Sequence, residues 1–139
     1  MRYLFALIIC ILPVSVIAQE WEDRQTFTPD AGGTMLRVIS STDTALFAPF
    51  IADFVSQNPK ISVEYLVTGT ADLDLRFRED PSAFDISISS AMDLQLRLAN
   101  DGFALPLEGL SHPSWAQWRN SLFAFTSEPA AIVINREAF

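Results

Sequence analysis

The sequence predicts an α/β fold in which a parallel-rich sheet carries helices on both faces. Three apolar, strand-like runs each lead through a turn into a helical segment, and this alternation is typical of a parallel sheet. Two of the three turns are rich in serine. Fifty per cent of the 139 residues are hydrophobic, so the chain can build one domain around one core.

The N-terminus is interpreted as a signal peptide and not as part of this fold. Arg2 is followed by a nearly unbroken apolar segment, and Ala18 ends a plausible cleavage signal before Gln19. The alternative is an uncleaved membrane anchor. However, the apolar segment is interrupted by Pro13 and is short for a membrane span of about 20 residues. We therefore expect an exported, periplasmic chain whose signal peptide is removed.

The first strand–helix unit follows a polar leader. Residues 19–34 have little periodicity and are predicted to form an extended leader. Residues 36–40 are an apolar run typical of a buried strand. Residues 44–57 place pairs of hydrophobic side chains four residues apart, which predicts a helix with one broad apolar face. Asn58-Pro59 would end this helix.

Two further units repeat the order. Residues 61–65 alternate apolar and polar side chains, which predicts a second strand, and residues 71–79 are predicted to form a moderate helix. In that helix arginines are interspersed among the carboxylates, and these charges are interpreted as a solvated face. Residues 84–89 form the third predicted strand and residues 92–100 the third helix, which Asp101-Gly102 terminates.

The last part of the chain is rich in aromatic side chains. Residues 103–107 are predicted to return to the edge of the sheet. Trp115 and Trp118 are three residues apart and are predicted to share one face of a short helix. Residues 130–135 are apolar and indicate a further strand shortly before the end at Phe139. We therefore expect this sequence to be a fragment.

The two serine-rich turns are the candidate binding features. The first is Ser40-Ser41-Thr42-Asp43, and the second is Ser89-Ser90-Ala91. Helix N-termini expose unpaired N–H groups, hydroxyls add further donors, and ligands bind such turns at the carboxyl ends of strands. The same side chains could instead serve as helix caps or pack closely. Both interpretations stay open; the first implies capture of a small anionic or polar solute.

Composition and motifs argue against several other functions. The chain has 9 basic and 17 acidic residues, a formal net charge of −8, and no basic patch that would suit nucleic acid. Cys10 lies in the predicted signal peptide and His112 is the single histidine, so a transition-metal site has little support. No phosphate-binding loop, dinucleotide fingerprint or serine–histidine–acid motif is present. We expect no enzyme activity, no cofactor and no metal.

Four stretches of the sequence resemble one known family. They are residues 36–43, residues 54–65, residues 85–104, which include Ser89-Ser90-Ala91-Met92-Asp93-Leu94-Gln95, and residues 123–135. They look like type 2 periplasmic solute-binding proteins of ABC transporters, in the branch for ferric iron, thiamine, phosphonate or phosphoglycerate uptake. The resemblance runs from about Leu36 to Phe139, and residues 85–104 are its most specific part.

The resemblance implies a fold, a domain division and a set of site residues. It implies two α/β lobes that close on a solute, of which this chain supplies the first and only the opening of the second. The division is residues 1–18 as signal peptide, 19–34 as leader, 35–125 as the first lobe, and 126–139 as the crossover and truncated start of the second lobe. The implied ligand contacts come from Ser41, Thr42, Ser90, Ala91 and Thr126.

The function implied by the resemblance is that of the substrate-binding component of an ABC-type importer. Such a protein, expected here as a monomer, delivers its solute to a permease in the inner membrane. Two alternatives stay open. One is a periplasmic solute sensor that feeds a two-component histidine kinase, because fold does not fix function. The other is an inactive, truncated remnant.

Overall fold

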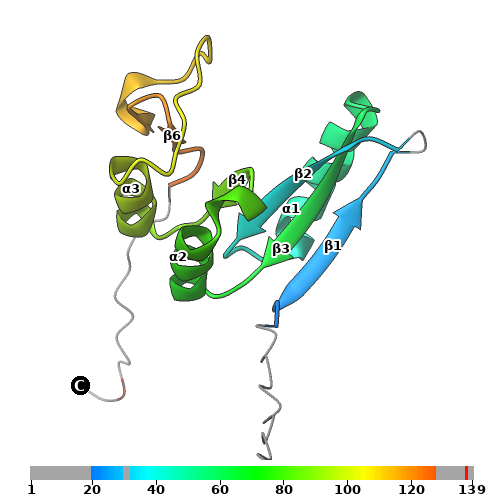
Figure 1. Ribbon diagram of the computed structural model, residues 1–139, viewed down its shortest axis with the longest axis horizontal. Coiled ribbons are helices and arrows are strands. Elements are labelled where there is room, and N and C mark those ends of the chain that lie inside the picture. The colour runs from blue at the N-terminus through cyan, green and yellow to red at the C-terminus, as the bar shows by residue number, and fades with distance from the viewer. Residues whose placement is uncertain (1–19, 30–31, 128–136, 138–139) are drawn as a thin grey trace, which may run out of the picture.

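The computed structural model describes residues 20–29, 32–127 and 137, and its main element is a four-stranded sheet in the order β1-β3-β2-β4 (Figure 1). The strands are β1 (Asp23–Phe27), β2 (Thr34–Ser40), β3 (Ile61–Val67) and β4 (Ile86–Ile88). The helices are α1 (Thr44–Gln57), α2 (Thr70–Glu79) and α3 (Met92–Asn100). The predicted signal peptide and the predicted strand at 130–135 lie outside the described residues.

The three predicted strand–helix units are present, and α1 and α3 have the predicted bounds. Strand β2 lies between β3 and β4 and runs parallel to both. Its last residue, Ser40, pairs with Val67 at the end of β3 and with Ile88 at the end of β4. The carboxyl ends of all three strands therefore meet at one edge of the sheet, where parallel α/β sheets bind ligands.

The predicted leader contains a strand that the sequence analysis missed. Strand β1 pairs antiparallel with β3, from Asp23 opposite Val67 to Phe27 opposite Val63, so the sheet is mixed. Four of the five residues of β1 are exposed, and only Phe27 is partly buried. An edge strand of this kind is held by backbone hydrogen bonds to one neighbour, and its sequence need not be apolar or alternating.

Helices cover both faces of the sheet, as predicted, and each face has its own core cluster (Figure 1). Adjacent residues of β2 point to opposite faces: Val38 packs with Ile51 and Val55 of α1, whereas Ile39 packs with residues of α2 and α3. The second cluster consists of Ile39, Leu73, Phe77 and Leu98. Burial on both faces explains why β2 has a run of apolar residues at its carboxyl end.

Two predictions for the later part of the chain were wrong. Residues 103–107 form no strand; Phe103 packs edge-on against Phe77 of α2, and Leu105 is exposed. Trp115 and Trp118 do not share a helix face. Trp115 lies in the single turn η2 (Ser114–Ala116), whereas Trp118 lies in the hairpin of β5 (Gln117–Trp118) and β6 (Leu122–Phe123).

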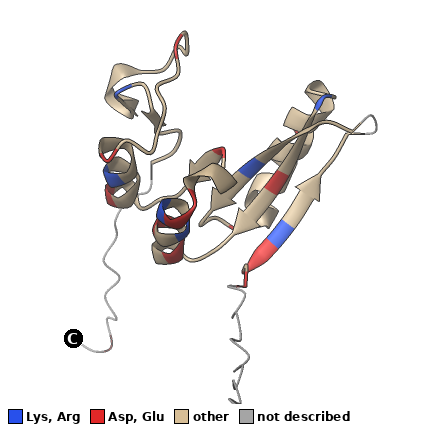
Figure 2. Cartoon of the chain, in the orientation of Figure 1, with Lys and Arg blue, Asp and Glu red and all other residues tan. Residues whose placement is uncertain are grey.

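The charged face of α2 is less solvated than its pattern indicated. Figure 2 shows both signs of charge on this helix, but Asp74 and Arg76 are buried. The Arg76 guanidinium lies 4.0 Å from the ring centre of Trp21 and donates to the Glu20 carbonyl at 3.0 Å. Asp74 accepts a hydrogen bond of 2.9 Å from Arg78. The chain just before β1 therefore covers part of α2.

Helix α2 offers a matched test of this packing. Leu73 is 1% exposed in the second core cluster, whereas Leu75, two residues later, is 54% exposed. Leu73→Ala is expected to lower the free energy of unfolding by about 2–5 kcal/mol because it leaves a cavity. Leu75→Ala is expected to change it by less than about 0.5 kcal/mol. Urea unfolding followed by circular dichroism measures both, and equal losses would contradict the assigned packing.

Candidate functional site

The two serine-rich turns lie side by side and are hydrogen-bonded to each other. Ser41 Oγ donates to Ser89 Oγ at 2.9 Å, and the Ser41 N–H donates to the Ile88 carbonyl at 3.1 Å. The first turn follows β2 and the second follows β4, so the parallel pairing of these strands brings the turns together. Residues 48 positions apart in the sequence thus form one polar surface.

Tyr65 of the neighbouring strand β3 holds the first serine-rich turn in place. Its side chain is fully buried, and its hydroxyl is hydrogen-bonded to Ser40 Oγ at 2.7 Å and to the Thr42 carbonyl at 3.0 Å. Ser40 Oγ also accepts from the Thr42 N–H at 3.0 Å. Burial raises the pKa of the Tyr65 hydroxyl above its ordinary value of 10.0.

Neither helix that starts at these turns has a side-chain cap. The N-cap residues are Asp43 for α1 and Ala91 for α3, and in neither case does the side chain accept a hydrogen bond from the first turn. The capping interpretation of the serine-rich turns is therefore not supported. Within the described residues, the turn serines bond one another and nearby N–H groups, as Ser89 Oγ does with the Ala91 N–H at 3.2 Å.

A cavity of about 1060 Å³ lies against this surface. Three parts of the chain line it: the β2–α1 junction with the first turns of α1, the β4–α3 junction with the first turn of α3, and the segment from 122 to 127. The lining residues are Thr42, Leu46, Phe47, Phe50, Ser87, Ile88, Ser89, Ser90, Met92, Gln95, Leu122, Phe123, Ala124, Phe125, Thr126 and Ser127. None of these lining residues is charged.

The structure places three of the five predicted site residues in this lining. Thr42, Ser90 and Thr126 line the cavity, although they come from three separate segments. Ser41 and Ala91 are not in the lining: the Ser41 hydroxyl faces Ser89, and Ala91 is the N-cap residue of α3. Contact of any of the five with a ligand stays a prediction.

Sequence reasoning missed the contribution of α1 to the aromatic wall of the cavity. Phe47 of α1 contacts Phe50 and also Phe125 edge-on, with ring centres 6.2 Å and 6.0 Å apart. The hydrophobic pairs of α1 were predicted to form one broad apolar face. Instead, Ile51 is buried against the sheet, whereas Phe50 is 72% exposed. Each hydrophobic pair of α1 consists of adjacent residues, and adjacent residues of a helix point about 100° apart. The pairs therefore indicated two apolar stripes on α1.

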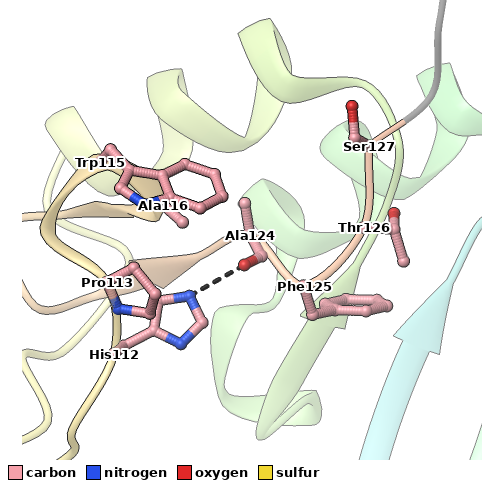
Figure 3. A pocket seen from close by; sticks show the side chains of 8 residues that line it. All are labelled: His112, Pro113, Trp115, Ala116, Ala124, Phe125, Thr126 and Ser127. Atoms are coloured by element: carbon pink, nitrogen blue, oxygen red, sulfur yellow. Dashed lines mark hydrogen bonds between the residues drawn. The ribbon is translucent and has the colours of Figure 1, made fainter.

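A smaller cavity of about 430 Å³ adjoins the same segment (Figure 3). His112 points toward the backbone of this segment, and its Nε2 lies 2.8 Å from the Ala124 carbonyl oxygen. Phe125, Thr126 and Ser127 line both cavities. The single histidine therefore has a structural contact, and it helps to hold the segment that closes one side of the larger cavity.

In residues 20–29, 32–127 and 137, no three His, Cys, Asp or Glu side chains gather so that they could hold a metal ion. No helix within the same ranges has the length and apolar character needed to cross a membrane.

Comparison with solved structures finds a similarity to a transport protein. The chain is similar to the substrate-binding protein of an ABC transporter from Agrobacterium tumefaciens, with 35% sequence identity and a TM-score of 0.65. The match covers 70% of this chain and 32% of that protein. The chain therefore spans about a third of the length of the protein it matches. No family model and no curated protein matches the chain.

The Tyr65–Ser40 contact can be tested by a double-mutant cycle. Tyr65→Phe is expected to lower the free energy of unfolding by about 1 kcal/mol, because Ser40 and the Thr42 carbonyl lose a partner. Combined with Ser40→Ala, the two changes should be non-additive by about 1 kcal/mol. Additivity would contradict a hydrogen bond between these side chains.

Burial of the Tyr65 hydroxyl predicts a dependence of stability on alkaline pH. Because the pKa of Tyr65 is raised in the folded state above its ordinary 10.0, the unfolded chain loses the phenol proton first as the pH rises. Stability should therefore be complete below about pH 10 and fall above it, less steeply in Tyr65→Phe. Denaturant unfolding of both chains between about pH 9 and pH 11 measures this. Parallel curves would contradict the assignment.

Proposed function

We propose that this chain belongs to a periplasmic substrate-binding component of an ABC-type importer, of the type 2 class. It captures a small anionic or polar solute and delivers it to a permease in the inner membrane. The similarity to an ABC-transporter substrate-binding protein over 70% of the chain supports this proposal. The apolar N-terminal segment before Gln19 supports export through a cleaved signal peptide.

The observation that carries the proposal is the cavity at the ends of β2 and β4. Its polar side includes residues with hydroxyl groups, among them Thr42, Ser90 and Thr126, which lie next to the starts of α1 and α3 or opposite them. Such donors bind the oxygens of a solute without forming or breaking a covalent bond. The lining holds no charged side chain that could act as general acid, base or nucleophile, so binding explains this surface better than catalysis.

The cavity is also open on its aromatic side. Leu46, Phe50 and Phe125 are each more than half exposed while lining it. The matched protein is about three times as long as the aligned part of its chain. We propose that further chain of a full-length protein covers this side and that closure over the solute is the capture step.

The proposal is tested by thermal unfolding of the full chain with inorganic phosphate, glycerol 3-phosphate, succinate and glucose. At least one of the four is expected to raise the Tm by several degrees, because a ligand that binds only the folded state stabilises it. Thr42→Val combined with Ser90→Ala should weaken the affinity for that solute about tenfold, which corresponds to about 1.4 kcal/mol.

The matched control for this test is Thr70→Val. Thr70 starts α2 after β3, at a turn that does not line the cavity, so this variant should keep the wild-type affinity. If none of the four solutes raises the Tm, or if Thr70→Val weakens binding as much as the double variant, the proposed function is contradicted.

A further inference from the structure

Gln95 stands out among the residues that line the cavity. It lies in α3, one turn after the second serine-rich turn, and only 7% of its surface is exposed. Its amide oxygen accepts a hydrogen bond of 3.2 Å from Ser87 Oγ, and Ser87 also lines the cavity. Its amide nitrogen, Nε2, is buried and has no hydrogen-bond partner among the described residues.

A buried amide of this kind needs an explanation. Burying an N–H donor without a partner costs free energy comparable to a lost hydrogen bond, and large apolar residues would fill the same space without that cost. Polar groups kept at such a cost are found where a ligand or water completes the bonding. Because Ser87 bonds the oxygen, the amide is oriented, and Gln95 is one of the residues that line a cavity of about 1060 Å³.

We propose that the Gln95 amide is a specificity-determining contact that donates a hydrogen bond from Nε2 to an acceptor oxygen of the bound solute. This inference rests on the proposed function and names the group that the solute must present there. Its lining neighbours are hydroxyl and apolar side chains without formal charge. The amide can therefore donate a hydrogen bond to a hydroxyl, a carboxylate or a phosphate oxygen of the solute. The measurements below distinguish these three groups.

The first measurement needs no solute. Gln95→Met replaces the unpaired donor by an apolar side chain of similar size, so the Tm of the solute-free chain should rise by about 4–8 °C if this removes about 1 kcal/mol of desolvation cost. Gln57→Met is the control, because Gln57 ends α1 on the surface and its amide donates to Asp53 at 2.7 Å. An unchanged or lower Tm for Gln95→Met would show that the protein itself satisfies the amide, and the proposal would be wrong.

The second measurement uses inorganic phosphate, glycerol 3-phosphate, succinate and glucose separately, by titration calorimetry. For the solute that binds wild type most tightly, Gln95→Met and Gln95→Glu should each weaken the affinity at least tenfold, and Gln57→Met should not change it. For phosphate, glycerol 3-phosphate or succinate the loss should be larger in Gln95→Glu, because a carboxylate repels an anionic oxygen; for glucose the two losses should be similar.

Different results would contradict the role of Gln95 and the proposed function. Wild-type affinity in Gln95→Met, while wild type binds one of the four solutes, would overturn the role of Gln95 and leave the proposed function standing. Failure of wild type to bind any of them would contradict the proposed function, and with it the inference that depends on it.

Discussion

The parallel pairing of β2 with both β3 and β4 is the constraint on which the candidate site depends. It brings the ends of three strands to one edge, so that Ser41 can bond Ser89 across 48 positions of sequence. Tyr65 reaches the first turn from β3 and holds it through Ser40. The polar surface is thus a property of the sheet, and a shift of one residue in β2 would turn Val38 and Ile39 to the wrong faces.

Several features of this edge of the sheet lower the stability of the fold. Binding of a solute at the edge would explain why they are present. Two helices start there without side-chain caps, a large aromatic ring at Phe50 is exposed, and the Nε2 of Gln95 is buried without a partner among the described residues. Each departs from what packing alone would select. All of them lie around one cavity. Similar features also occur elsewhere in the described residues: α2 starts without a side-chain cap, Trp115 is 87% exposed, and Asp74 Oδ1 is buried without a partner.

The sequence was sufficient to predict the elements whose burial follows a simple period. It was insufficient where contacts with other parts of the chain decide the local structure. Helices α1 and α3 were predicted with their bounds because of their spacing and stop signals. Strand β1 was missed because an exposed edge strand has no required pattern, and residues 103–107 were predicted as a strand although Leu105 is exposed. The two serine-rich turns could be identified from the sequence as hydrogen-bond donors at the ends of strands. The contribution of Gln95 was not, because an unpaired amide can be recognised only once its surroundings are known.

We propose that the two strand-end turns act as one solute-binding surface. The decisive experiment records backbone amide signals by NMR while the chain is titrated with glycerol 3-phosphate, succinate, phosphate and glucose in turn. We predict that the signals of residues 41–43 and 89–92 shift together with one dissociation constant for at least one solute, while those of residues 69–71 stay in place. Shifts confined to one turn, or no shift at either turn with any of the four, would contradict the account.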